Sequence, residues 1–292
     1  MNQNCLVTKL KASVNDITLV KLGGFIIKVK AASEGISRFY ASADAPVTLT
    51  SSNNYPLTCN GITSNEIILN DTTDVKFPAG EYIVNVGSNY KFDGCVNTTT
   101  AFEINLNDVK YQTKARYILT GSSGTLNGDI SNIKDITGLL YLLGGNINHN
   151  LYGDIANLPN TLYNIKLSYS EVTGDIASLD FVSFPEFKIE LSLLKTNVYG
   201  TLESVVEKLR QKQSNGSITF NVTGTNVTLG GSLLSRASAS RVGILWWDAT
   251  GIAYINGSDD NVSNGAAVIY VKNVNSTQVS EWSSLGNTII EV

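Results

Sequence analysis

Apolar and polar residues follow one another in short runs over the first third of the chain, in the pattern of half-buried β-strands. These runs are rich in β-branched and aromatic residues, are separated by Gly, Asn, Asp and Ser, and comprise residues 25–29, 38–40, 66–69 and 82–86. The segment 77–82, with Pro78 and Gly80, predicts a turn that feeds a strand. Residues 1–113 are therefore expected to form a β-sandwich-like module. The alternating segment 5–10 is expected to be a first strand or an arm that docks on a neighbouring subunit.

The hydrophobic pattern changes at about residue 114 and becomes a repeat. Each unit begins with a short apolar strand, and these strands are expected at 117–119, 140–142, 165–167, 189–191 and 218–220. A phrase of glycine, a short polar residue and an aliphatic residue follows, starting 25, 21 and 26 residues apart. Its first two positions are Gly128-Asp129, Gly153-Asp154, Gly174-Asp175 and Gly200-Thr201. Because one repeat cannot bury its apolar residues alone, residues 114–235 are expected to stack into a solenoid.

The last repeat and the end of the chain carry further patterns. Leu202, Val205, Val206 and Leu209 stand at helical spacing, which predicts an amphipathic helix from Thr201 to about residue 213. Beyond residue 236, strands are expected at 242–247 and 252–255 around a turn at 248–251, then at 267–271 and 288–292, with a helical turn near 277–282. Residues 236–292 should form C-terminal β repeats and a cap, because the last coil of a solenoid would otherwise expose its core.

The clearest repeat lies between residues 150 and 167. It reads Asn150-Leu151-Tyr152-Gly153-Asp154-Ile155 and continues through Leu158, Leu162 and Ile165 to Leu167. This resembles the leucine-rich repeat family, in its variant L-x-x-L-x-L-x-x-N-x-L-x-G-x-I-P-x-x-L, over residues 117 to about 235. The resemblance implies a mainly β solenoid with short helices. The proline after the isoleucine is missing and asparagine rarely occupies its ladder position, so a regular asparagine ladder is not expected.

The repeated aspartates allow two interpretations. Asp129, Asp154 and Asp175 could form an acidic ladder for calcium or for acid/base chemistry on a sugar. Alternatively each Asp follows a turn glycine and caps the next helical turn by accepting backbone N–H groups. The fourth copy favours the cap, because Thr201 can cap a helix but supplies no carboxylate.

Composition excludes several classes of function. Only 16% of the 292 residues are charged and the net charge is −4, whereas nucleic-acid binding needs many Lys and Arg. The chain has no apolar stretch of the roughly 20 residues that a membrane span needs. The first eleven residues lack the pattern of a secretory signal, so we expect the chain to stay where it is made. Cys5, Cys59 and Cys95 are expected to be free thiols, with a Cys59–Cys95 disulfide as the alternative.

The sequence offers little material for catalysis. His149 is the only histidine, which excludes a multi-histidine metal site within one chain, and it is expected to be solvated in a loop. The segment 121–124 is rich in glycine but lacks the Gly-Lys-Ser/Thr ending that cradles phosphate. We therefore expect no catalytic residue, no metal, no cofactor and no enzymatic activity.

Aromatic residues supply the candidate contact positions. They are Tyr141, Tyr163, Tyr169, Trp246, Trp247 and Tyr254, together with Tyr152 and Tyr199. Aromatic faces stack on sugars, and the surrounding amides could bind hydroxyl groups. Packing is the competing explanation. Adjacent strand residues face opposite ways, so at least one of the two adjacent tryptophans should lie in a core or an interface.

The opening Asn4-Cys5-Leu6-Val7-Thr8-Lys9-Leu10-Lys11 and the repeats rich in Asn, Thr and Gly resemble virion proteins of tailed crAss-like phages that infect gut bacteria. The resemblance implies a virion structural protein, a head fibre or a tail-associated decoration, anchored through residues 1–113 and assembled in the host cytoplasm. Its partners would be other virion proteins, copies of itself in a homo-oligomer such as a trimer, and host surface polysaccharide. Two alternatives stay open, namely a bacterial cell-surface leucine-rich-repeat adhesin and a polysaccharide depolymerase.

Overall fold

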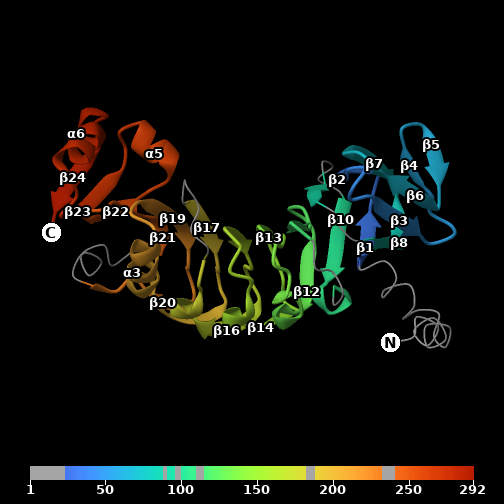
Figure 1. Cartoon of the computed structure of the whole chain (residues 1–292), viewed down its shortest axis with the longest axis horizontal. Coiled ribbons are helices and arrows are strands. Elements are labelled where there is room, and N and C mark those ends of the chain that lie inside the picture. Colours follow the sequence, from blue (N-terminus) through green and yellow to red (C-terminus); the bar gives the residue numbers. More distant parts are fainter. Residues whose placement is uncertain (1–23, 88–90, 96–99, 110–114, 182–187, 232–240) are drawn as a thin grey trace. The chain divides into compact units, whose positions relative to one another are not determined.

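The computed structural model describes residues 24–87, 91–95, 100–109, 115–181, 188–231 and 241–292 (Figure 1). Strands make up 46% and helices 17% of it, which confirms the expected mainly β fold with short helices. The chain divides into two compact units, Met1–Leu151 and Tyr152–Val292, called the first and the second unit below. The expected strand or arm at 5–10 lies outside the described residues.

The first unit contains two sheets (Figure 1). Its elements are β1 (Phe25–Ala31), β2 (Gly35–Tyr40), β3 (Val47–Ser51), β4 (Leu57–Cys59), β5 (Ile62–Ser64), β6 (Glu66–Leu69), β7 (Thr73–Phe77), β8 (Gly80–Val86), β9 (Lys91–Cys95), β10 (Thr100–Asn105), η1 (Leu106–Asp108), β11 (Tyr117–Leu119), β12 (Thr125–Asp129), η2 (Ile130–Ile133) and β13 (Tyr141–Leu143). One sheet has the order β12-β10-β1-β8-β3-β6 and the other β13-β11-β9-β2-β7-β4-β5.

The core of the first unit lies between these sheets. Along β1 the side chains of Phe25, Ile27 and Val29 are buried while those of Lys28 and Lys30 are exposed, as period-two alternation requires. Rings from both sheets meet inside, since the centroid of Phe77 on β7 lies 5.3 Å from that of Phe102 on β10. The two sheets therefore share one hydrophobic core.

The sheets continue past the expected boundary at residue 113. β10 pairs in parallel with β12, with Ile104 opposite Leu126, and β9 pairs in parallel with β11. The change in sequence pattern near 114 therefore marks a change from antiparallel to parallel pairing rather than a break between cores. The division between the two compact units lies at residues 151 and 152.

The second unit also contains two sheets. Its elements are β14 (Leu151–Asp154), η3 (Ile155–Asn157), β15 (Asn164–Lys166), β16 (Glu171–Asp175), η4 (Ile176–Ser178), β17 (Lys188–Ser192), β18 (Asn197–Thr201), α3 (Leu202–Lys212), β19 (Gly216–Asn221), β20 (Asn226–Thr228), β21 (Val242–Trp247), β22 (Ile252–Asn256), α5 (Asp259–Ser263), β23 (Val268–Lys272), α6 (Ser276–Ser284) and β24 (Thr288–Glu291). The orders are β14-β16-β18-β20, all parallel, and β15-β17-β19-β21-β22-β23-β24.

Each repeat of the second unit adds one strand to each sheet in chain order. β15, β17 and β19 pair in parallel, and Figure 1 shows β17 and β19 side by side. The apolar residues that precede the repeated glycines, Val172 and Val198, are fully buried, as is Val205. Leu158, an apolar residue of the clearest repeat, is only half-buried. Neighbouring repeats therefore bury most of one another's apolar residues.

The expected helix is confirmed as α3. Thr201 is its N-cap, and its buried residues are the four that the spacing selected. The expected strands and the turn at 248–251 are also present, and β19 pairs antiparallel with β21 across residue 235. The short helix α5 was not predicted, although Ser258 and Asn261 form a capping box at its start.

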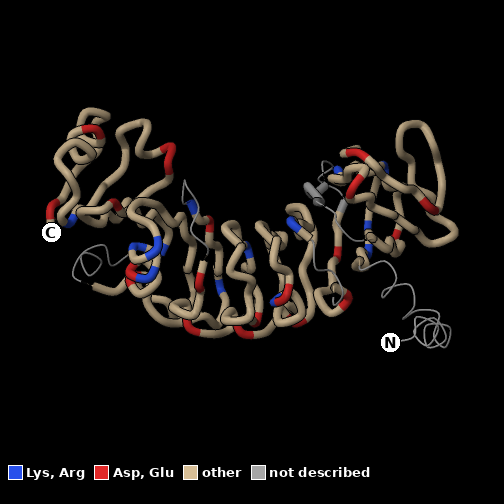
Figure 2. Tube along the Cα trace, viewed as in Figure 1, with Lys and Arg blue, Asp and Glu red and all other residues tan. Residues whose placement is uncertain are grey.

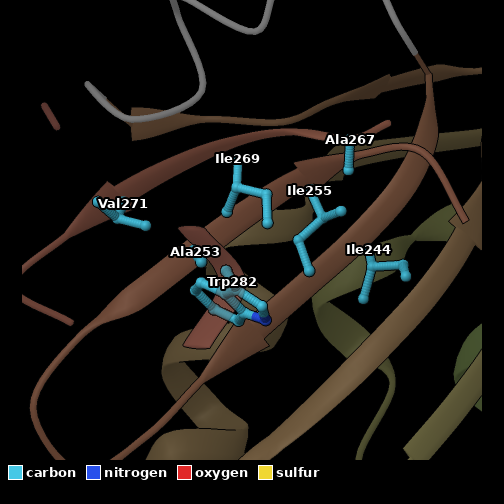
Figure 3. Close-up of a cluster of buried hydrophobic side chains, with 7 residues drawn as sticks. All are labelled: Ile244, Ala253, Ile255, Ala267, Ile269, Val271 and Trp282. Atoms are coloured by element: carbon cyan, nitrogen blue, oxygen red, sulfur yellow. The ribbon is translucent and has the colours of Figure 1, made fainter. Parts of the chain in front are cut away.

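The last strands carry a second layer on one face. A buried cluster there contains Ile244, Ala253, Ile255, Ala267, Ile269, Val271 and Trp282 (Figure 3). Trp282 comes from α6 and the others come from β21, β22, β23 and the residue before β23. The opposite face of the same strands holds Leu245, Trp247 and Tyr254, which are buried as well. These strands are therefore covered on both faces.

Candidate functional site

The repeated aspartates cap short 3-10 helices. The Oδ1 atom of Asp129 accepts the backbone N–H of Ser131 at 2.8 Å. Asp154 and Asp175 do the same for the residue two positions on, each at 2.9 Å. Thr201 accepts from the backbone of Ser204 at 3.4 Å and begins α3. Each of these side chains satisfies an N–H that the start of a helix leaves unbonded.

An earlier copy of the repeated Gly-Asp-Ile motif is not recognised from the sequence. Asn105 ends β10 and accepts the backbone N–H of Asn107 at 3.0 Å, which caps η1, and Leu106 after it is buried. Ile104 stands where the later copies have glycine, so the search for Gly-Asp-Ile could not find it. The remaining signal is the order of an apolar, an Asx and an aliphatic residue.

The repeated glycines lie inside strands and not in turns, which corrects the sequence-based interpretation. Gly128, Gly174 and Gly200 are the next-to-last residues of β12, β16 and β18, with φ of +89°, +117° and +102°, and Gly153, in the same place in β14, has φ of +116°. A Cβ at Gly174 would lie 2.2 Å from Oδ1 of Asp154. At Gly200 it would lie 2.2 Å from Oδ1 of Asp175.

At Gly128 a Cβ would lie 2.4 Å from Oδ1 of Asn105, so the same relation starts one repeat earlier. In all three places the capping oxygen of one repeat occupies the space that a side chain of the next repeat would need. Glycine therefore permits the close approach of successive repeats, and the cap and the glycine act as an interlocking pair.

The cap at Asp175 can be tested by substitution. Asp175→Ala should lower the free energy of unfolding of the second unit by about 1 kcal/mol, while Asp175→Asn, which keeps the accepting oxygen, should change it by a few tenths. All three tryptophans lie in the second unit, so tryptophan fluorescence during urea unfolding reports this unit. Equal stability of the alanine and asparagine variants would contradict a capping role.

Two of the aromatic candidates cannot contact a ligand. Trp247 and Tyr254 are completely buried. The indole nitrogen of Trp247 donates to the carbonyl oxygen of Gln213 at 3.2 Å, and the hydroxyl of Tyr254 donates to that of Val242 at 3.2 Å. Both belong to the core of the second unit.

The other candidates are half-buried and do not form one platform. Tyr141 in the first unit stacks on Tyr117 with ring centroids 4.7 Å apart. In the second unit the ammonium of Lys195 lies 5.1 Å from the ring centroid of Tyr169, and Tyr163 is half-buried on its own segment. Trp246 meets Trp282 edge to face at 5.1 Å. Trp246 also lines a groove with several polar side chains.

Two further aromatic rings are the most exposed among the described residues. Tyr152 on β14 and Tyr199 on β18 are 44% and 49% exposed, and they belong to one sheet with β16 between them.

No family model, no curated protein and no solved structure matches this chain. Within the described residues no three His, Cys, Asp or Glu side chains could hold a metal ion together, and no helix there is long and apolar enough to span a membrane.

The single histidine is exposed, and the described cysteine is buried. His149 is exposed beside the fully buried Asn148. Cys59 is a free, buried thiol, and its Sγ lies 3.8 Å from Oγ1 of Thr73. Cys5 and the side chain of Cys95 lie outside the described part of the chain.

The turn between β21 and β22 is organised by one carboxylate. Oδ1 of Asp248 accepts the backbone N–H groups of Thr250 and Gly251 and the hydroxyl of Thr250, each at 2.7 Å. Oδ2 accepts from the side-chain amide of Asn275 at 2.6 Å. Partial burial opposes ionisation, but these hydrogen bonds outweigh it, and the pKa of Asp248 is lowered below its ordinary value.

This shift predicts a pH dependence. Because the folded-state pKa is lowered, the carboxylate stabilises the fold above its ordinary pKa, and this stabilisation is lost as the pH falls below about 4. Asp248→Asn should therefore reduce the loss of second-unit stability between pH 5 and pH 3, as measured by urea unfolding at each pH. An unchanged pH profile in this variant would contradict the role given to Asp248.

Proposed function

We propose that the chain is a non-catalytic structural protein of a bacteriophage virion, a head fibre or a tail-associated decoration protein. Residues 1–113 would attach it to the particle and to further copies of itself. Residues 114–235 would form a leucine-rich-repeat-like solenoid, ended by residues 236–292 as a cap. Its exposed strand faces would bind neighbouring virion proteins and glycans of the host surface.

The observation that carries this proposal is the interlock of cap and glycine between successive repeats. Such stacking yields a continuous core with strand faces on the outside, which suits attachment and recognition. The exposed positions of β16, β18 and β20 are Glu171, Thr173, Asp175, Asn197, Tyr199, Asn226 and Thr228, of which two are charged. Figure 2 likewise shows few charged residues along these strands. Uncharged polar and aromatic surfaces favour contact with proteins and sugars.

The placement of the aspartates favours this function over a polysaccharide depolymerase. Glycoside hydrolysis needs two carboxyl groups that face one substrate. In the described repeats, Oδ1 of each phrase aspartate instead accepts the backbone N–H of its own 3-10 helix, and at Asp154 and Asp175 it also lies against the next glycine.

The proposal is tested on purified phage particles. An antibody raised against the chain should label particles in the electron microscope, and mass spectrometry of gradient-purified virions should detect the chain in several copies per particle. Recovery of the chain only as a free monomer, with none in virions, would refute the proposal. Portal and capsid genes flanking its gene are also expected.

Thiol titration separates the phage protein from the bacterial adhesin. An intracellularly assembled protein should release three reactive thiols on denaturation, whereas an exported adhesin should have two of its three cysteines oxidised. The buried free thiol of Cys59 supports the first case. A count of one thiol in native material, together with chain on the bacterial envelope, would favour the adhesin.

A further inference from the structure

A groove of about 530 Å³ lies in the second unit beside the two C-terminal helices. Its walls come from β17, β19 and β21 on one side and from α5 and α6 on the other. Its aromatic lining comprises Trp246 and Trp282, and its polar side chains are those of Lys188, Asn215, Ser217, Asp259 and Gln278. This volume falls within the range of ordinary ligand sites.

The groove forms where the helical layer ends. Ser217 on β19 pairs with Trp246 on β21, so both side chains lie on the same face of the sheet. On that face the cluster of Figure 3 joins β21, β22 and β23 to α6 through Trp282. The same face of β19 and β17 stays open, because Thr219 and Lys188 are exposed. The apolar cluster therefore lies directly beside the exposed polar face of β17 and β19.

The polar side chains of the groove make no hydrogen bond to the described part of the protein. Throughout the described chain, no protein group hydrogen-bonds to the side chains of Lys188, Asn215, Ser217, Asp259 or Gln278, or to the indole N–H of Trp246. These groups include donors, acceptors and two amides that are both. The one cationic and the one anionic side chain among them balance in charge.

We propose that this groove binds a neutral oligosaccharide, with one pyranose ring against the indole of Trp246 and its hydroxyl groups on the surrounding amides. A pyranose has an apolar C–H face and a rim of hydroxyls that both donate and accept, which matches an aromatic wall with unpaired polar side chains beside it. The balanced charge favours a neutral sugar over an acidic one. This proposal rests on the proposed function, whose host contact it makes specific.

The test uses the full-length chain and neutral hexasaccharides of glucose, mannose, galactose and N-acetylglucosamine, titrated by calorimetry. At least one should bind saturably with Kd of about 1 mM or tighter, as a single weak site used in many copies requires. Trp246→Ala should weaken binding about tenfold or more, and Gln278→Ala about two- to tenfold through one lost hydrogen bond.

Two control variants change residues outside the groove. Ser280→Ala changes an exposed residue of the same helix outside the groove, and Tyr199→Ala removes an exposed ring from the other sheet; both should bind as the unchanged chain does. Because Trp246 packs on Trp282, its removal could affect folding, whereas Gln278→Ala leaves that contact intact. Failure of all four sugars to bind, or binding unaltered in both groove variants, overturns the proposal.

The results also separate this proposal from the proposed function. A chain present in virions that binds none of the sugars would overturn the groove proposal alone. A chain that binds sugar through Trp246 but is absent from virions would refute the virion assignment and leave the groove site standing.

Discussion

Gly200→Ala is expected to lower the free energy of unfolding of the second unit by about 3 kcal/mol. Two causes combine. Gly200 has φ of +102°, which an alanine adopts only with strain, and the new Cβ would lie 2.2 Å from Oδ1 of Asp175. Either the carboxylate must leave the N–H of Ala177 or the two repeats must separate. Urea unfolding followed by tryptophan fluorescence measures the loss.

Gly286 offers a matched control for the backbone term. Its φ is +98°, almost the same as that of Gly200, but the nearest atom to a new Cβ is 3.7 Å away. Gly286→Ala should therefore cost only the strain of positive φ, about 1 kcal/mol. Equal losses at the two glycines would contradict the interlock between repeats.

A double-mutant cycle isolates the contact itself. Asp175→Ala removes the oxygen that blocks a Cβ at position 200, at the cost of the cap. In the Asp175→Ala background, Gly200→Ala should lower the free energy of unfolding by about 1 to 2 kcal/mol less than it does alone. The effects of substitutions at residues in contact are not additive. Strict additivity of the two substitutions would show that the close approach is not a constraint.

Features set by local sequence could be predicted, and α3 is the clearest of them. Its four buried residues lie three or four positions apart in the chain, so its apolar face is readable without tertiary information. The hairpin of β21 and β22 is similar, because Asp248 and Gly251 mark its turn locally. The strands at 117–119 and 141–143 also follow from short apolar runs.

Features set by contact between distant segments could not be predicted from the sequence. The strands that hold the glycines looked like turns, since Gly and Asp are turn residues, and only the capping oxygen of the preceding repeat explains why glycine stands there. Strands pair across the expected boundaries near 113 and 235, and no local pattern in the sequence shows this pairing. The candidate groove needs side chains of α6 and β19 to line one space, which no local pattern encodes.

The two adjacent tryptophans show how the same local rule reaches its limit. Strand geometry correctly requires that Trp246 and Trp247 face opposite sides of the sheet. It does not say which side is covered. Trp247 faces the core that α3 and β19 share, and Trp246 faces the edge of the layer formed by α6, which leaves it half-buried beside polar residues.

Trp247→Ala is expected to lower the free energy of unfolding of the second unit by about 3 to 5 kcal/mol, the range for removing a fully buried large aromatic side chain. The residue pairs with Gly216 at the start of β19, and its indole nitrogen holds the carbonyl of Gln213 at the end of α3. Its loss opens a cavity where helix and sheet join. Trp247→Phe should lose less, because the ring volume largely remains and about 1 kcal/mol of hydrogen bonding disappears.

Trp246→Ala provides the comparison for this prediction, since it removes the same side chain from the neighbouring position on the other face. It should cost the second unit about 1 to 2 kcal/mol, less than half the effect at Trp247, because the ring is already partly exposed. In each variant the two remaining tryptophans still report unfolding in urea. If both alanine variants lost the same stability, the distinction between a core tryptophan and a groove tryptophan would fail, and with it the reason for seeking the sugar at Trp246.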